Sequence, residues 1–461
     1  MQAVVKGNQD FTKGKITGKL ISFVLPIMAT GMLQILYNAS DMVVVGNFSA
    51  NGSNAMGAVG SCTSLINLLI GLFIGISIGS GVVAARNIGA KRFDNVKSII
   101  DTSVIFAFFC GIVVSLFGII FSKNLLVLMG TPEEILNEAD PYLKAYLVGV
   151  PANLVYLVLA AILRSSGDSK TPLIILAISG LFNVIVNVIM VTCFKMGAIG
   201  VGIATVGSQV LSLILIAIFM FKKTDYLKFS FKNFKLSTKV LANVIAIGVP
   251  AGLQSVLFSL SNVVIQSTVN SYGPETISGN AAAGNLEGFT YMSMNSFHQA
   301  VVTFVSQNMG AKKYKRIPKI AITGIILVSI VGVFLGVGIY LLGDTLLSIY
   351  EPESAIIRAW GLKRLSVVSA FHFLCGIVDV GTATLRGMGK STTSMIIVLF
   401  GSVALRIVWI YTICAIIPNN IFYLYVSYPI SWTLTSIALF LTSFVVYKKL
   451  LKKETSQIIE E

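Results

Sequence analysis

Residues 16–45 read ITGKLISFVLPIMATGMLQILYNASDMVVV, and this stretch decides the fold class. After Lys19 its only charged residue is Asp41. About 20 consecutive apolar residues are enough for a helix to cross a membrane. A charge within the hydrocarbon costs roughly 2.5–3.5 kcal/mol on insertion scales. The stretch therefore predicts a membrane-spanning helix, and Asp41 needs a functional or structural reason to lie inside it.

The composition extends this prediction to the whole chain. The 461 residues are 55% hydrophobic and 11% charged, whereas a soluble domain has about 25% charged residues. Long apolar runs recur from end to end, which predicts an all-α polytopic membrane protein. Polar breaks divide the chain into twelve predicted spans: 16–45, 54–85, 96–122, 139–163, 171–192, 196–221, 239–270, 276–309, 317–341, 357–385, 392–416 and 422–448.

The net charge of +15 is a matter of topology rather than of a nucleic-acid partner. Most Lys and Arg residues fall in loops on one side of the predicted spans, and the positive-inside rule makes that side cytoplasmic. We therefore expect a multi-pass protein of the plasma (inner) membrane with both termini in the cytoplasm. The five cysteines are scattered singly and the two histidines lack metal spacing, so neither a metal nor a cofactor is expected.

The sequence repeats itself across a basic central stretch, 222–239. NASDMVVVG, which contains Asp41, aligns with SLSNVVIQS, which has Asn262 at the same place. RNIGAKRF and LRSSGDSKT align with QNMGAKKY and LRGMGKSTT, and TPEE echoes EPES. We expect two homologous six-helix lobes, 1–224 and 225–461. An even number of spans per half predicts a pseudo-twofold axis along the membrane normal.

These duplicated segments resemble the multidrug and toxic compound extrusion (MATE) family over essentially the whole chain. The segments that carry the resemblance are LPIMATGMLQILYNASDMVVVGNF, ARNIGAKR, LRSSGDSKTP, LFNVIVN and LRGMGKSTT. The resemblance implies a V-shaped pair of lobes and alternating access. It also implies secondary-active efflux of cationic, amphipathic compounds in exchange for H⁺ or Na⁺, with no cofactor besides the coupling ion.

The resemblance also assigns candidate residues. The family's first-span Asp falls on Asp41, and the paired polar residues of its fifth span fall on Asn183 and Asn187. One branch has an Asp at the second of those positions, so this chain has one carboxylate fewer. A tenth-span Asp of another branch matches Asp379. The choice between H⁺ and Na⁺, and between branches, therefore stays open.

The second branch also carries a Glu in the seventh span, which this chain lacks. It offers Gln254 and Asn262 there, and Glu287 in the eighth span. An alternative for Glu287 and Asp379 is an ion pair with Arg406, the only basic residue that we expect deep in a span. A buried pair fixes an arrangement more than it stabilises it.

The residues around these acids suggest a cavity and its gates. Tyr37 lies one helical turn from Asp41, and Gln34 one turn further, so both are candidates for the same site. Flexible Met and flat aromatic side chains suit apolar cations, and packing explains them equally well. The first span of each half contains one proline, which can act as a hinge or as a passive kink. The cavity candidates are Tyr291, Met292, Met294 and Phe297, and the hinge candidates are Pro26 and Pro250.

Two other functions compete with cation export. A flippase for lipid-linked precursors shares the fold superfamily that the resemblance implies, but it should line its cavity with Lys or Arg. A membrane-embedded transferase needs clustered carboxylates for Mg²⁺, and the chain has neither a DxxxD nor an HExxH motif. We expect a transporter rather than an enzyme, a monomer whose partners are small organic cations and membrane lipids.

Overall fold

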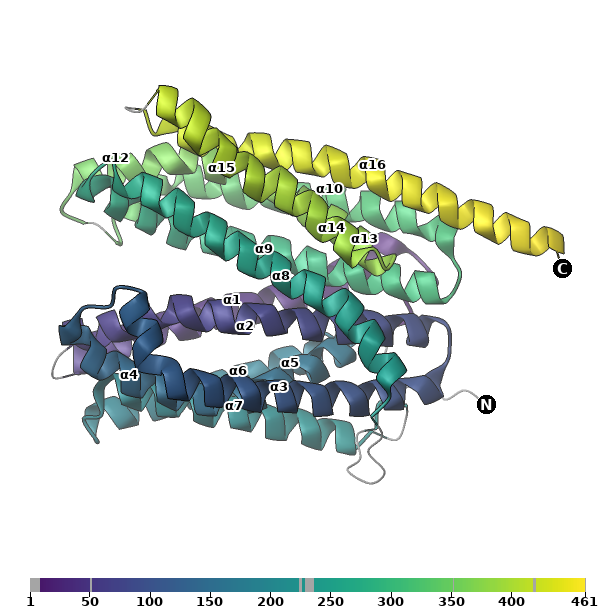
Figure 1. Cartoon of the computed structure of the whole chain (residues 1–461), viewed down its shortest axis with the longest axis horizontal. Coiled ribbons are helices and arrows are strands. Elements are labelled where there is room, and N and C mark those ends of the chain that lie inside the picture. Colours follow the sequence, from purple (N-terminus) through teal and green to yellow (C-terminus); the bar gives the residue numbers. More distant parts are fainter. Residues whose placement is uncertain are drawn as a thin grey trace. The chain divides into compact units, whose positions relative to one another are not determined.

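A computed structural model describes residues 9–49, 52–223, 226–228, 236–350, 352–417 and 420–460. In this part of the chain the regular elements are all helical (Figure 1), which confirms the all-α class. The expected boundary between residues 224 and 225, and part of the basic stretch 222–239, fall on residues outside the described ranges. The division into lobes at that point stays a prediction.

The first half of the chain contains seven helices. They are α1 (Ile16–Phe48), α2 (Gly52–Gly89), α3 (Phe93–Leu128), α4 (Glu133–Val148), α5 (Val150–Ser165), α6 (Lys170–Thr192) and α7 (Gly197–Phe221). Pro26 lies inside α1 without interrupting it. Pro151 lies in the first turn of α5, where its missing N–H has no intrahelical partner to lose. This explains why the predicted span 139–163 is built from two helices.

The second half contains longer helices and several short segments. They are α8 (Thr238–Asn270), α9 (Pro274–Gly310), η1 (Tyr314–Arg316), α10 (Ile317–Leu341), α11 (Gly343–Leu347), α12 (Ala355–Arg364), η2 (Leu365–Ser369), α13 (His372–Gly387), α14 (Ser391–Val398), η3 (Leu399–Ala404), α15 (Leu405–Trp409), η4 (Ile410–Cys414) and α16 (Phe422–Glu460). The segments η2, η3 and η4 are π-helical turns.

The span count agrees with the sequence within the described residues. Nine helices there are long and apolar enough to cross a membrane, and two bent pairs bring the number to eleven. The pairs are α4 with α5, bent by 46°, and α12 to η2 with α13, bent by 41°. The twelfth predicted span, 276–309, lies in α9, which is 37 residues long but richer in polar side chains. A total of twelve is therefore consistent with the structure.

The repeated turns have matching backbones. Lys91 and Lys312, at equivalent places in the two GAK segments, have positive φ values of 57° and 55°. Gly167 and Gly389, in the two LRxxG segments, have φ values of 94° and 85°. A positive φ is uncommon for a residue with a side chain. Its occurrence at both lysines indicates that the repeat extends to local geometry.

The described chain forms two compact units. One unit is Ala29–Gly252 with the residues before Phe11, and the other is Phe11–Met28 with Leu253–Glu461. We call them unit 1 and unit 2. Each division falls inside a long helix shortly after its proline, Pro26 in α1 and Pro250 in α8. The first half of α1 therefore belongs to unit 2, and the first half of α8 belongs to unit 1.

Small residues allow close backbone packing in unit 1. A Cβ atom on Gly75 or Gly79 of α2 would collide with backbone atoms of Gly248 and of its neighbours in α8. Small residues spaced four apart let two membrane helices approach closely. Glycine at these positions is required because any side chain would separate α2 from the first half of α8.

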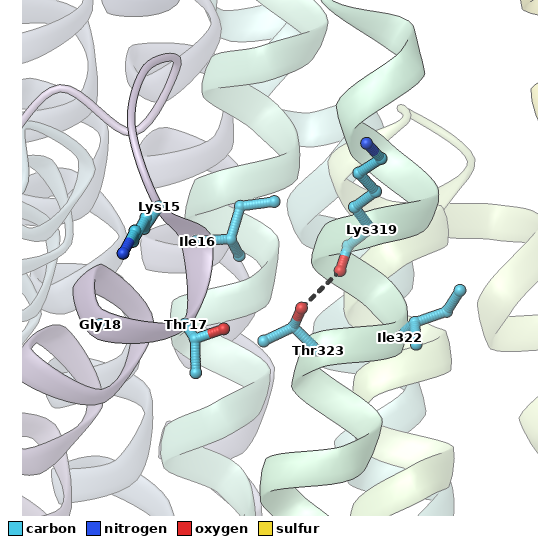
Figure 2. Close-up of a pocket in the computed structure, with 7 residues that line it drawn as sticks. All are labelled: Lys15, Ile16, Thr17, Gly18, Lys319, Ile322 and Thr323. Carbon is cyan, nitrogen blue, oxygen red and sulfur yellow. Dashed lines mark hydrogen bonds between the residues drawn. The ribbon is translucent and has the colours of Figure 1, made fainter.

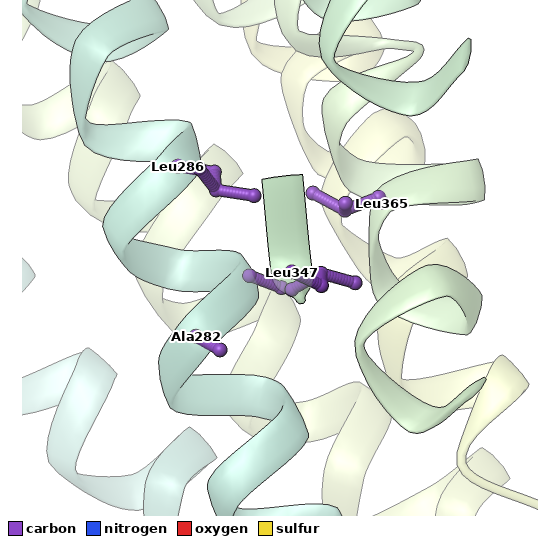
Figure 3. Packing of buried hydrophobic residues seen from close by; sticks show 5 residues of the cluster. Ala282, Leu286, Leu347 and Leu365 are labelled. Carbon is purple, nitrogen blue, oxygen red and sulfur yellow. The ribbon is translucent and has the colours of Figure 1, made fainter. Parts of the chain in front are cut away.

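An apolar cluster in unit 2 positions two charged residues. It consists of Ala282, Ala283 and Leu286 from α9, Leu347 from α11 and Leu365 from η2 (Figure 3). Glu287 follows Leu286 directly, and Arg364 precedes Leu365. The packing of these leucines therefore fixes the two chain segments from which the charged side chains extend.

Candidate functional site

The structure places two of the predicted residues, Asn183 and Asn187, beside Asp41. Asp41 lies in α1 with 9% of its surface exposed, and Asn183 and Asn187 lie one turn apart on α6. Asn187 Nδ2 donates to Asp41 Oδ1 at 2.8 Å. The Asn183 amide, oriented with its nitrogen toward Asp41, donates at 3.0 Å and accepts from the Thr205 backbone N–H at 3.3 Å. This orientation satisfies both ends of the Asn183 side chain.

Asn183 and Asn187 hold the Asp41 carboxylate by hydrogen bonds but do not neutralise its charge. Amide groups donate hydrogen bonds but bring no positive charge. None of the described basic side chains forms an ion pair with Asp41. A carboxylate in this setting has a free charge to share with a proton or a cation.

Tyr37 closes one side of the same region. Its hydroxyl donates to the Ala177 carbonyl of α6 at 3.3 Å. Its ring lies against Gly180, where a Cβ atom would collide with it. Gly180 therefore allows α1 and α6 to approach each other near Asp41. Gln34, one turn earlier on α1, is exposed.

Glu287 in unit 2 has a different environment. Arg364 binds its carboxylate through Nε at 3.1 Å and Nη2 at 2.7 Å. The Glu287 side chain is 7% exposed and the Arg364 side chain 12% exposed. Arg364 Nη1 also donates to Asn280 Oδ1 at 2.7 Å. The prediction that Arg406 pairs with Glu287 was wrong, because Arg364 at the end of α12 forms the ion pair with Glu287 instead. Glu287 is therefore already neutralised by the chain itself.

Arg406 lies between aromatic rings. Its Cζ is 4.2 Å from the centroid of Tyr428 and 5.4 Å from that of Trp432, and its Nε donates to Ser431 at 2.8 Å. Aromatic faces attract cations through their quadrupole. Arg386 is buried as well, and the Arg364 side chain is only 12% exposed. The expectation that Arg406 alone lies deep in a span stays a prediction.

Asp379 is the least satisfied of the three acids. Its Oδ2 atom is buried and has no hydrogen-bond partner among the described residues. Arg386 and Tyr291 lie near enough to act on it electrostatically. The structure thus leaves part of the Asp379 carboxylate available for a proton, a cation or a water molecule.

A buried network orders the helix that carries Asp379. Arg386 donates to Gln254 Oε1 at 2.7 Å and lies 3.1 Å from His298 Nε2. Since Arg is only a donor, Nε2 accepts and His298 Nδ1 carries the proton, which it donates to the Asp379 carbonyl at 3.0 Å. Gln254 is therefore an arginine partner in this structure.

The remaining candidates are placed as follows. Asn262 on α8 and Tyr291 on α9 are exposed, and Met292 is half-buried. Met294 is fully buried against Gly332 and Gly376, and Phe297 is also buried. Packing accounts for these last two, and a cavity role for this set stays a prediction. α1 and α8 run continuously through Pro26 and Pro250, so hinge motion stays a prediction as well.

Sequence reasoning missed several residues of these networks. Thr205, His298, Arg364 and Arg386 contribute to them from α7, α9, α12 and α13. Arg364 lies inside the predicted tenth span, 357–385, and Arg386 directly follows it, and these positions were the available signal. Which acid each one faces depends on contacts between helices distant in sequence.

An all-helical, internally repeated membrane protein with isolated buried acids has the architecture of a secondary transporter. The family model MatE matches residues 26–189 and, a second time, residues 250–412. The chain belongs to the MATE family of multidrug efflux transporters. The double match also confirms the internal repeat.

Curated relatives cover most of the chain. The probable multidrug resistance protein YoeA of Bacillus subtilis (strain 168) is 26% identical over 460 residues, which are 98% of each chain. The probable multidrug resistance protein NorM of Thermotoga maritima is 25% identical over 388 residues, 83% of this chain and 82% of the relative. Membership of a transporter family agrees with the expectation that the chain is not an enzyme.

Solved structures share the fold. An outward-facing multidrug resistance MATE family transporter of the MOP superfamily has a TM-score of 0.90 at 20% identity, with 98% of this chain and 100% of that chain covered. A MOP superfamily transporter from Pyrococcus furiosus, described as having a binding pocket of reverse polarity, has a TM-score of 0.91 at 19% identity, with 97% and 99% covered.

Proposed function

We propose that this transporter is an antiporter of the plasma (inner) membrane that exports cationic amphipathic compounds in exchange for H⁺ or Na⁺ by alternating access. The proposal places the coupling carboxylate at Asp41 and both termini in the cytoplasm. The coupling ion is the only cofactor. The transporter acts as a monomer, and its partners are small organic cations and membrane lipids.

One observation carries the proposal. Asp41 is buried and held by two amides, Asn183 and Asn187, without an ion pair to a described basic residue. Glu287, by contrast, is neutralised by Arg364. A buried charge is costly unless it has a partner. A mobile proton or cation is the partner that Asp41 lacks.

Exchange at a single carboxylate suits transport across a charged membrane. A proton and a monovalent organic cation compete for the one negative group, so each excludes the other. Their exchange moves no net charge and avoids the electrical cost of about 2.3 kcal/mol per charge at 100 mV. Sodium can take the same role if amide oxygens join the carboxylate as ligands.

A lipid-linked precursor flippase is the second candidate. Two buried arginines, Arg386 and Arg406, and the mostly buried Arg364 lie in unit 2 with two acids, Glu287 and Asp379. The Pyrococcus furiosus relative is described as having a pocket of reverse polarity that suggests a different function. A surplus of positive charge suits an anionic phosphate headgroup. A membrane-embedded transferase has no comparable support.

The test is ethidium efflux from everted vesicles that contain the wild type or Asp41→Asn, with an imposed H⁺ gradient and then a Na⁺ gradient. Asp94→Asn, at an exposed position at the start of α3, removes the same charge away from the site. We expect Asp41→Asn to lose gradient-driven efflux and to bind ethidium more weakly, because the shared carboxylate is gone, and Asp94→Asn to keep both. Equal efflux by the wild type and Asp41→Asn would refute the role of Asp41. Failure of the wild type to move any organic cation would favour the flippase.

A further inference from the structure

A groove in unit 2 lies between the first turns of two membrane helices. It has a volume of about 510 Å³, and Figure 2 shows the residues along it. Its lining residues are Lys15, Ile16, Thr17 and Gly18 from the start of α1, and Lys319, Ile322 and Thr323 from α10. Both helices are long and apolar enough to span a membrane. The groove therefore lies where these spans enter the membrane.

The two lysines of the groove are available for a ligand. Lys15 and Lys319 are exposed, and neither ammonium group has a hydrogen bond or an ion pair with a described residue. The segments 11–19 and 312–319, which flank the groove, contain eight basic residues and no acidic one. Positive charge from two chain segments thus lies along one groove, with the Lys15 side chain directed away from α10 and the Lys319 side chain directed along it (Figure 2).

Neighbouring basic residues are already engaged and form the support of the groove. Lys313 Nζ donates to the Thr12 carbonyl at 2.9 Å, and Arg316 Nη2 donates to the Gly14 carbonyl at 3.0 Å. Lys19 Nζ donates to the Lys13 carbonyl at 2.9 Å. These bonds fix the backbone just before Lys15, so the position of Lys15 beside α10 is set without a ligand.

Phe11 anchors the same segment from behind. Its ring stacks on Phe304 at 3.9 Å and meets Phe23 edge-on at 4.9 Å. Its N–H donates to Gln307 Oε1 at 3.1 Å, and Asn308 Nδ2 donates to its carbonyl at 3.1 Å. A fully buried aromatic ring with both backbone groups satisfied is a rigid anchor. The backbone that carries Lys15 is therefore fixed in advance, which reduces the entropy lost on binding, and the two exposed lysine side chains turn toward the ligand.

The groove combines charge with apolar surface. Ile322 is exposed on α10, one turn from Lys319, and Ile16 points from α1 toward the α10 helix (Figure 2). Thr323 uses its hydroxyl within α10, where it donates to the Lys319 carbonyl at 2.7 Å. A phosphate with attached acyl chains fits two ammonium groups followed by isoleucines, whereas a free anion has no use for the apolar part.

We propose that this groove binds the headgroup phosphate of an anionic phospholipid, with Lys15 and Lys319 as its two cationic contacts and the acyl chains along Ile322. Basic pockets between transmembrane helices are suited to anionic headgroups, and basic residues near a membrane surface attract anionic lipids. The lipid would join the start of α1 to α10 within unit 2 and so stabilise the folded protein.

The test uses the full-length protein in detergent micelles, with phosphatidylglycerol or phosphatidylcholine added. Thermal unfolding gives the shift in Tm, and native mass spectrometry counts the retained lipid. Lys15→Gln/Lys319→Gln removes two charges from the groove. Lys452→Gln/Lys453→Gln removes two exposed charges from the end of α16 and serves as the matched control.

We expect phosphatidylglycerol to raise the Tm of the wild type more than phosphatidylcholine does. The groove variant should lose more than half of that difference and retain less lipid, while the control keeps both. Lys15→Arg/Lys319→Arg should restore the effect. The proposal is overturned if the groove variant responds like the wild type, or if inorganic phosphate alone reproduces the full shift. Should the double variant not fold, each single Lys→Gln variant is judged by the same criteria.

Discussion

Arg364 binds both carboxylate oxygens of Glu287, from Nε at 3.1 Å and from Nη2 at 2.7 Å. Arg364 is the last residue of α12, and Glu287 lies in α9, so the pair joins these two helices within unit 2. A bidentate contact between guanidinium and carboxylate is directional as well as charged. It therefore fixes the relative rotation of these two helices. Its loss should lower the stability of the folded protein more than it lowers the transport rate.

We expect Glu287→Gln to destabilise the protein by about 3–5 kcal/mol, because it leaves a buried guanidinium without its counter-charge. Thermal unfolding in detergent measures this loss. Glu275→Gln, at an exposed position in the first turn of α9, should change the Tm little. The double variant Glu287→Met/Arg364→Met should recover much of the loss. A double variant that is no better than the single one would contradict a pairwise interaction.

Asn187→Asp should create a stronger cation site. It replaces the amide that contacts Asp41 at 2.8 Å by a second carboxylate, and two carboxylates at one site need a shared cation or proton. We expect NaCl to raise the Tm of this variant more than choline chloride does, and more than NaCl raises that of the wild type. The isosteric change keeps the packing. Identical salt responses of both proteins would show that position 187 does not belong to an ion site.

Gly180→Ala should disturb the Asp41 region through Tyr37. The added methyl group would collide with the Tyr37 ring, and overpacking of this kind costs about 1–3 kcal/mol. Gly284→Ala is the matched control, because nothing lies near the Cβ position there. Thermal unfolding and ethidium efflux should both decline for Gly180→Ala only. Adding Tyr37→Ala should relieve the collision, and a failure to relieve it would place the fault elsewhere.

Phe11→Ala should destabilise unit 2 by about 3–5 kcal/mol, the usual cost of truncating a buried Phe. Phe11 is fully buried between Phe23 and Phe304. Phe109→Ala, at an exposed position on α3, removes the same side chain from a surface that faces lipid. Limited proteolysis before α1 provides an independent measurement. Equal Tm values for the two variants would show that the anchor contributes nothing to stability.

The fold was predictable because hydrophobic length is a local signal. Runs such as 16–45 and 317–341 need only their own residues to identify a span. The bend between α4 and α5 was not predicted, since its cause is a junction at Gly149 and Pro151 within an otherwise apolar run. The more polar α9 was predicted as the span 276–309 from its boundaries, and the structure has a 37-residue helix there.

The candidate site was predictable only in part. Asn183 and Asn187 are one turn apart, so their common face follows from helical geometry, and the resemblance to a family supplied their link to Asp41. The pair Glu287–Arg364 joins residues 77 positions apart. Many basic residues were available at such separations, and the choice among them depends on how α9 and α12 pack.

The π-helical turn η2, Leu365–Ser369, accounts for part of a difference in length between the two copies of the repeat. The interval from Pro132 to Arg164 in the first copy corresponds to the longer interval from Pro352 to Arg386 in the second. A π turn bonds each N–H one residue further back than an α turn does, so it holds an additional residue without opening a loop. An insertion can therefore be absorbed inside the membrane-spanning part of the chain while the turns at both ends keep their place. The two copies have diverged in length within a helix, where a simple alignment of loops would not reveal it.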